Sequence, residues 1–304
     1  MLVSAARAVR RWLTEAGPSR LPSRAAAPGD RMPIFVISYN RGRLLERVVR
    51  SYANLSQPTE IVIHDNGSDD EATRDVLTKF ERAGTPVVRS GKIRSADELN
   101  LGDKTIRRYF KRRGTLAPYI VTDCDIDMSA ALPEAIAVYG ELLDKFPDVA
   151  CVGPMLRIRD IPRHYTLYNH VMNRHIEQFW EKLPEWTETS RGPVAFLRAK
   201  IDTTFALHRA GAPFHRLKSG IRVYHPYEAL HLDWYPDLAD AGDPAYRRSS
   251  SVKISTWANE VEFERHGDDR LKYEGFNYVD LDESGALTVK SFRFGEAAAG
   301  SAPE

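Results

Sequence analysis

The chain has 304 residues, of which 42% are hydrophobic, enough for one large domain or a domain with an appendage. Its 43 Lys and Arg residues nearly balance its 42 Asp and Glu residues, so no global field points to nucleic acid or an acidic polymer as a partner. The two cysteines, Cys124 and Cys151, lie inside apolar runs. This placement argues against a disulfide framework and indicates buried, inert thiols in a reducing compartment.

Both ends of the chain differ in composition from the body. Residues 1–24 carry five arginines against one acid, with apolar side chains at roughly helical spacing. We expect a short helix packed on the body or a frayed terminus, and the alternative is an amphipathic helix in peripheral contact with an anionic membrane face. Residues 1–30 are therefore interpreted as a basic extension with a Pro-, Ser- and Ala-rich linker, and residues 295–304 as a disordered tail. The sequence has neither a membrane-spanning apolar run nor a secretory signal, which predicts a cytoplasmic protein.

After the linker, short β-branched runs alternate with amphipathic helical runs, a pattern that predicts crossover units and a mostly parallel sheet flanked by helices. Apolar residues recur at helical spacing after the first strand, as at Leu45, Val48 and Tyr52. Ser68 and Glu71 have the spacing of a capping box at the start of the next helix. Strands are expected at residues 34–38, 60–64, 86–89, from 119 onward and at 149–152, with further helices around residues 104–113 and 133–146.

The fourth strand carries three alternating carboxylates, at Asp123, Asp125 and Asp127. Residues alternate sides along an extended chain, so the three carboxylates project the same way if the extension persists. Because like charges repel, such a cluster favours a hard divalent cation with oxygen ligands, Mn²⁺ or Mg²⁺. The alternative is an ordinary strand end followed by a polar turn.

The other strands of the first half also end in polar residues, at 38–41, 64–70 and 90–94. Ligands of parallel sheets bind beyond the carboxyl ends of the strands, so these segments should share one edge with the carboxylates. The sequence has no phosphate-binding glycine-rich loop of the dinucleotide or P-loop type. We therefore expect phosphates to be held through the metal.

Four segments in this order and spacing resemble a known family: Ile37–Arg41, Ile63–Ser68, Asn100–Gly102 and Val121–Asp125. They look like the nucleotide-binding half of GT-A-fold glycosyltransferases, most similar to the family 2 group. The resemblance covers roughly residues 33–152 well and the remainder only loosely.

The resemblance implies a Rossmann-like α/β fold with a nucleotide-sugar-binding half at residues 31–155 and an acceptor-binding, catalytic half at residues 156–294. It implies that Asp65 accepts a hydrogen bond from the base, for which the imide N–H of uracil is a suitable donor, although the alternative is a turn residue that caps the next helix. Asp123 approaches the ribose, and Asp125 binds the Mn²⁺ or Mg²⁺ that bridges the diphosphate. The implied nucleotide-binding residues are Ser38, Tyr39, Asn40, Arg41, Asp65, Asn66, Arg94 and Asp123.

The second half departs from the family pattern. Members usually carry a Glu-Asp pair that supplies the general base, whereas here Glu228 is followed by Ala229. Three carboxylates therefore compete for that role, namely Asp202, Glu228 and Asp233. His231 is a candidate third metal ligand beside Asp123 and Asp125, and the alternative is a histidine hydrogen-bonded in a packed loop.

Residues 157–186 are rich in histidine and aromatic side chains, but the histidine spacings fit no zinc pattern, which favours an acceptor-binding or lid segment. The arginines and lysines of the helix at 104–113 are expected to form a solvated face, with an anionic acceptor or a membrane as the alternative.

The predicted function is transfer of a sugar from a UDP-linked donor to a glycan or glycolipid acceptor, with inversion, in polysaccharide or glycoconjugate synthesis. Two alternatives remain. One is a phosphatase of the haloacid dehalogenase type, whose nucleophile motif is also a strand ending in Asp-x-Asp. The other is a nucleotide- or carbohydrate-binding relic of the fold without catalysis.

Overall fold

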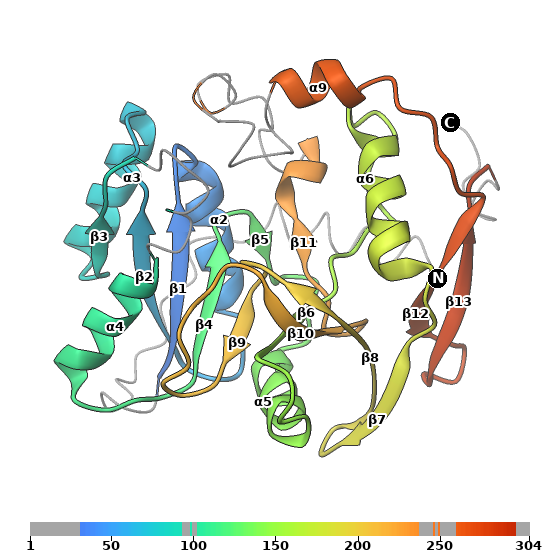
Figure 1. The fold of residues 1–304 in the computed structure, drawn as a ribbon, viewed down its shortest axis with the longest axis horizontal. Coiled ribbons are helices and arrows are strands. Elements are labelled where there is room, and N and C mark those ends of the chain that lie inside the picture. The colour runs from blue at the N-terminus through green and yellow to red at the C-terminus, as the bar shows by residue number, and fades with distance from the viewer. Residues whose placement is uncertain are drawn as a thin grey trace.

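The computed structural model describes residues 31–92, 98, 102–236, 246, 249 and 260–295. A nine-stranded sheet with the order β3-β2-β1-β4-β9-β6-β10-β8-β7 forms its centre (Figure 1). From the pairings, seven of the nine strands run in one direction, and β8 and β9 run in the other. The strands are β1 (Met32–Ser38), β2 (Thr59–Asp65), β3 (Val87–Arg89), β4 (Tyr119–Asp123), β6 (Cys151–Pro154), β7 (Glu185–Thr189), β8 (Gly192–Ile201), β9 (Ala206–His208) and β10 (Lys218–Val223).

Helices cover both faces of the sheet because its central strands are apolar on both sides. In β1, Ile34 and Val36 join the larger core with α2, α3 and α5, whereas Phe35 packs in a second core with Ile106 and Phe110 of α4. This alternation follows from the two-residue period of a strand. The helices with these roles are α2 (Gly42–Tyr52), α3 (Glu71–Arg82), α4 (Gly102–Arg113) and α5 (Ala135–Lys145).

The second half of the chain adds smaller elements beside the sheet. A short ladder joins β5 (Ile126–Asp127) to β11 (Leu230–His231), and β12 (Gly275–Leu281) pairs with β13 (Leu287–Arg293) in a hairpin. Figure 1 shows α9 at the top of the view, above α6, with the hairpin to the right of α6. The remaining helical elements are α6 (Tyr168–His175), the π-helical turn η2 (Ile176–Trp180), the 3₁₀ turn η3 (Leu232–Trp234) and α9 (Glu260–His266).

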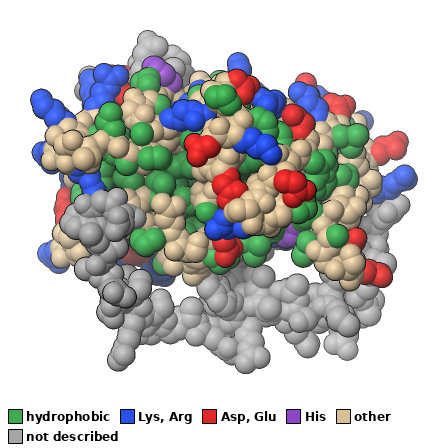
Figure 2. Space-filling view, turned by 90° about the horizontal axis from the view of Figure 1, so that it is seen from below, with side chains coloured by type: hydrophobic (Ala, Val, Ile, Leu, Met, Phe, Trp, Pro, Cys, Tyr) green, Lys and Arg blue, Asp and Glu red, His purple; other side chains and the backbone are tan. Residues whose placement is uncertain are grey.

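The two edges of the sheet differ in character. The edge at the amino ends of the strands is seen in Figure 2, where apolar side chains gather between groups of Lys and Arg. A hollow of about 630 Å³ lies near that edge, between α4 and the segments 114–119 and 211–213. The polar side chains of the first half converge at the other edge, at the carboxyl ends of the strands.

The predicted α/β class with a mostly parallel sheet flanked by helices is confirmed, and every strand and helix predicted above has a counterpart within a few residues. Both cysteines are buried, as expected. Among the described residues, no helix is both long and apolar enough to cross a membrane. The predictions for residues 1–30, for Arg94 and for residues 296–304 lie outside the described residues.

Two local predictions are wrong. The cap of α3 is Asp70, whose carboxylate accepts from Thr73 N at 2.7 Å, and not Ser68. The extension of β4 also ends at Asp123, because a turn precedes β5. Asp127 has partners of its own and accepts hydrogen bonds from Arg47 Nε at 3.2 Å and Ser129 N at 2.7 Å.

Candidate functional site

The sheet brings the polar strand ends of the first half to one edge. Ser38 is in register with Asp65 on β2, and Ile37 is in register with Asp123 on β4. Parallel strands in register end at the same height, so the residues that follow them share one rim. The chain has no glycine-rich phosphate loop there, and side chains therefore define the chemistry of this rim.

Arg41, which follows β1, lies between two carboxylates. Its Nη1 donates to Asp125 Oδ2 at 2.5 Å, and its Nη2 donates to both oxygens of Asp233 at 2.5 and 2.6 Å. All three side chains are at most 10% exposed. His231 adds its Nε2 at 3.9 Å from Asp125 Oδ2, and its ring stacks on Trp234 with 4.5 Å between centroids. β4 and the β11–η3 segment thus meet at one buried ionic cluster.

The residues of this cluster fit a divalent cation. Asp125, His231 and Asp233 each offer a ligand atom, and these atoms lie within 4.8 Å of one another. Asp125 Oδ1 is buried without a hydrogen-bond partner among the described residues. A carboxylate oxygen that binds a metal ion is expected to have this property. Two carboxylates and one imidazole suit Mn²⁺, and Mg²⁺ with added water. Of the three ligands predicted from sequence, Asp125 and His231 belong to this group, and Asp233 was predicted as a base.

Asp123 belongs to an adjoining group of polar side chains. Its carboxylate accepts from the Thr203 hydroxyl, and its backbone N–H donates to Thr203 O at 2.8 Å. Burial raises the pKa of Asp123 to about 7, with Arg216 opposing this shift and the charges of Asp125 and Asp202 adding to it. Asp202 accepts from Thr204 Oγ1 at 2.6 Å. The segment between β8 and β9 therefore places a further carboxylate, that of Asp202, beside Asp123 at the end of β4.

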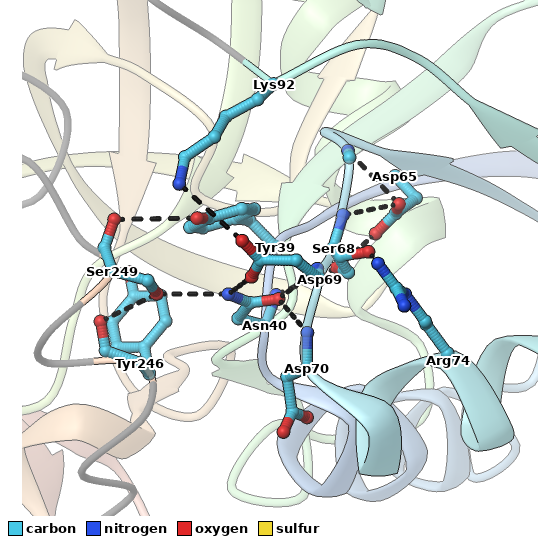
Figure 3. A network of polar contacts seen from close by, with 11 residues as sticks. Tyr39, Asn40, Asp65, Ser68, Asp69, Asp70, Arg74, Lys92, Tyr246 and Ser249 are labelled. Carbon is cyan, nitrogen blue, oxygen red and sulfur yellow. Dashed lines mark hydrogen bonds and ion pairs between the residues drawn. The ribbon is translucent and has the colours of Figure 1, made fainter.

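Asp65 organises the turn after β2 (Figure 3). Its carboxylate accepts from Gly67 N at 3.1 Å, from Ser68 N at 2.9 Å and from Ser68 Oγ at 2.5 Å. Ser68 Oγ in turn accepts from Asn40 N at 2.9 Å. Asp65 is 1% exposed and holds this turn, but it does not cap the next helix, since Asp70 caps α3. Its contact with a nucleotide base remains a prediction.

Asn40 connects this turn to a distant part of the chain. It has a positive φ of 47°, and its side chain bonds to Asp69 Oδ1 at 2.6 Å, to the N–H groups of residues 69 and 70, and to Ser249 Oγ at 3.0 Å (Figure 3). Tyr246 stacks on the guanidinium of Arg41, 3.7 Å from the ring centroid. The sequence carries no signal for these two C-terminal partners, because more than 200 positions separate them from Asn40 and Arg41.

The other predicted site residues are distributed differently. Glu228 is 1% exposed and accepts hydrogen bonds from Arg159 Nη1 on both oxygens, at 2.6 and 2.8 Å. Asn66 donates its N–H to Ser38 O at 2.8 Å and so lies on the rim, with Ser38 buried beneath it. Tyr39 contributes its hydroxyl to Ser249 O at 3.5 Å. The structure therefore gathers Ser38, Tyr39, Asn40, Arg41, Asp65, Asn66, Asp123, Asp125, His231 and Asp233 along one edge, and it gives Glu228 a separate buried ion pair.

No family model and no curated protein matches the sequence. Solved structures with a similar fold include the mannosyltransferase PcManGT from Pyrobaculum calidifontis in complex with GDP-Man and Mn²⁺ (21% identity, 52% of this chain, 44% of that chain, TM-score 0.32). They also include S. aureus TarS 1-349 in complex with UDP (13% identity, 59% of this chain, 46% of that chain, TM-score 0.35). A third is glucosyl-3-phosphoglycerate synthase from Mycobacterium tuberculosis in complex with phosphoglyceric acid (14% identity, 50% of this chain, 51% of that chain, TM-score 0.31). At such low identities and TM-scores the likeness assigns no activity to this chain. The chain spans about half the length of these solved structures.

Proposed function

We propose that the chain is a metal-dependent glycosyltransferase that moves a sugar from a UDP-linked donor to a glycan or glycolipid acceptor, with inversion, in polysaccharide or glycoconjugate synthesis. The observation that carries this proposal is the convergence of Asp125, His231 and Asp233 within 4.8 Å, at the rim where β1, β2 and β4 end. A bound Mn²⁺ or Mg²⁺ supplies Lewis-acid stabilisation of the departing diphosphate. We assign Asp125, His231 and Asp233 as its ligands and Asp123 to the ribose.

The residues of the rim divide the remaining work. Once a metal takes the carboxylates of Asp125 and Asp233, Arg41 offers a second positive charge for the diphosphate, since transition-state charge is best stabilised by groups already in place. Asp65 and Asn66 border the pocket for the base. Asp202 is our choice for the general base, because a carboxylate in that role needs a free oxygen within reach of the acceptor hydroxyl. Only one of its oxygens has a hydrogen bond among the described residues, whereas both oxygens of Glu228 are held by Arg159.

In the proposed reaction, the acceptor oxygen bonds to the anomeric carbon while the bond from that carbon to the diphosphate oxygen breaks. Asp202 takes the proton of the acceptor hydroxyl, and the leaving nucleoside diphosphate carries away the bonding electrons. Attack from the face opposite the leaving group inverts the anomeric centre.

The proposal is tested by calorimetric titration of UDP and GDP into the purified protein, first with Mn²⁺ and then with EDTA. Solved structures of similar fold contain GDP-Man in one case and UDP in another, so both nucleotides are needed. We expect UDP to bind only with Mn²⁺, and Asp125→Asn to weaken that binding at least tenfold, by analogy with the effect of altering a metal's shell. Hydrolysis of UDP-sugars then separates an active enzyme from a binding relic. If neither UDP nor GDP binds, the proposal is contradicted, and a phosphatase assay becomes the next experiment.

A further inference from the structure

A second group of potential metal ligands lies between α6 and the end of α9, outside the rim described above. His170 Nδ1 lies 3.0 Å from Asp269 Oδ2, and His266 Nδ1 lies 3.2 Å from the same oxygen. The two imidazole rings stack with 3.9 Å between centroids. One ligand atom from each of these three residues lies within 4.8 Å of the others. We propose that His170, His266 and Asp269 form a Zn²⁺ site that joins α6 to the segment after α9.

The spacing of the donor atoms suits a small tetrahedral ion. Zinc binds histidine nitrogen and carboxylate oxygen at about 2.0–2.2 Å, which places two ligands of a regular tetrahedron about 3.3–3.6 Å apart by geometry. The distances from Asp269 Oδ2 to His170 Nδ1 and His266 Nδ1, 3.0 and 3.2 Å, are close to that edge length. The carboxylate–imidazole distances therefore need to open only slightly, whereas the two stacked rings, inclined by 23° to each other, must turn so that a nitrogen of each faces the ion. Water or another group supplies the fourth position.

The chemistry of the donors separates this site from the first one. Imidazole is a preferred ligand of zinc and other late transition metals, whereas oxygen-rich sets favour Mg²⁺ and Mn²⁺. The rim offers two carboxylates and one imidazole, and this cluster offers two imidazoles and one carboxylate. The same chain thus presents two sites of opposite composition.

A carboxylate behind one ring completes the arrangement. Glu262 is 5% exposed, and its Oε2 lies 3.5 Å from His266 Nε2. This nitrogen is the one that does not face Asp269. Metal-binding histidines commonly donate their other N–H to a carboxylate, which orients the ring and raises its basicity. Glu262 is thus a positioning residue for His266.

The backbone around the cluster is already ordered by side chains of α6. Asn169 Nδ2 donates to Asp269 O and Asn173 Nδ2 donates to Arg270 O, both at 2.8 Å. Asn173 Oδ1 also accepts from Lys272 N at 2.8 Å. The loop is therefore positioned independently of the ion, and the partly exposed side chains of His170, His266 and Asp269 leave a path for it from solvent.

The test uses the full chain, stripped with EDTA and transferred to chelator-free buffer, with Zn²⁺ alone as the probe. Calorimetry and metal analysis after gel filtration should give one Zn²⁺ that His170→Ala and His266→Ala each abolish, and Glu262→Gln should weaken its binding by about 10–100-fold. His215→Ala, which removes an exposed histidine elsewhere, should leave it unchanged.

Circular dichroism verifies that each variant folds, and Asp269→Asn provides a nearly isosteric loss of one ligand. Asp125→Asn should leave this Zn²⁺ in place while it weakens Mn²⁺-dependent UDP binding at least tenfold, so the two sites are tested separately. Failure of the wild-type protein to retain Zn²⁺, or Zn²⁺ affinities within about twofold in folded His170→Ala, His266→Ala and wild-type proteins, overturns the proposal.

Discussion

The guanidinium of Arg41 donates to the carboxylate of Asp125 across 2.5 Å, in surroundings where both side chains are less than 10% exposed. Asp125 is also the central residue of the candidate divalent-cation site, together with His231 and Asp233. Arg41 and a divalent cation therefore compete for the same carboxylates. The stability of the folded protein should therefore depend on whether Arg41 or a divalent cation neutralises Asp125 and Asp233.

Replacement of Arg41 by Met should make the protein depend on a divalent cation for stability. Without the guanidinium, two buried carboxylates face each other, which costs about 3–5 kcal/mol when a buried pair loses one partner. In EDTA we expect the Tm of Arg41→Met to fall by roughly 6–15 °C for a domain of this size, and Mn²⁺ should recover most of that loss. Thermal unfolding followed by circular dichroism measures both effects.

Arg47→Met is the matched control, because Arg47 pairs with Asp127 at 3.2 Å, away from the cation cluster. Mn²⁺ should stabilise Arg47→Met no more than it stabilises wild type, so the loss caused by this substitution should not be recovered. An equal Mn²⁺ response in Arg41→Met, Arg47→Met and wild type would show that Asp125 and Asp233 do not hold the ion.

Substitution of the three candidate bases should separate their roles. Asp202→Asn should lower turnover by about 10²–10⁴-fold, the usual contribution of a general base, while UDP affinity remains within about twofold. Asp233→Asn should weaken Mn²⁺ binding as well as turnover. Glu228→Gln should mainly destabilise the fold, since it removes the charge that neutralises Arg159. Steady-state kinetics and UDP titration check the three outcomes, and similar mild losses at all positions would exclude Asp202 as the base.

The stability of the protein should rise with pH between about 8 and 10.5 because of Lys218. Burial lowers the pKa of this lysine to about 8, near His208 Nε2 at 3.4 Å. The unfolded chain binds the proton more tightly, so the penalty for the charged form is complete below pH 8 and disappears above the unfolded pKa of about 10.4.

Lys218→Met should therefore stabilise the protein by about 1–2 kcal/mol below pH 8, a figure reduced for the partial exposure of the side chain. The gain should shrink toward pH 10.5. Urea unfolding at several pH values measures it, with Lys200→Met as the control that removes an exposed lysine from β8. A gain that does not vary with pH would assign the effect to packing alone.

Gly67 should tolerate no side chain, since it has a φ of +78° and an added Cβ would lie 2.7 Å from Lys92 N. Gly84 has a similar φ of +83°, but an added Cβ meets nothing within 4 Å. Gly84→Ala should thus cost about 1–2 kcal/mol for the left-handed backbone, and Gly67→Ala should cost more and weaken UDP binding through the turn that Asp65 holds. Equal losses in urea unfolding with intact UDP binding would show that this turn does not border the nucleotide pocket.

Much of the first half was predictable because its signals are local. The two-residue and helical periods of β1 and α2 follow from which side chains face the core, and each is visible within about a dozen residues. The rule that parallel strands present their carboxyl ends together then placed Ser38, Asp65 and Asp123 on one edge without coordinates. The prediction that the strand extends past Asp123 was wrong, because a turn begins there and includes Asp125. Nothing in an alternating run specifies where the chain bends.

The α/β class, the order of the first elements and the candidate carboxylates could be predicted from the amino-acid order, since they depend on periodicity and strand direction. The partner that neutralises each buried charge is seen only in the folded chain: Arg41 for Asp125 and Asp233, and Arg159 for Glu228. It also brought His170 to His266, a pairing across nearly a hundred positions that no spacing rule can reveal. Buried charges must be compensated wherever the fold places them, and the partner that does so is chosen by proximity in space and not by separation along the chain.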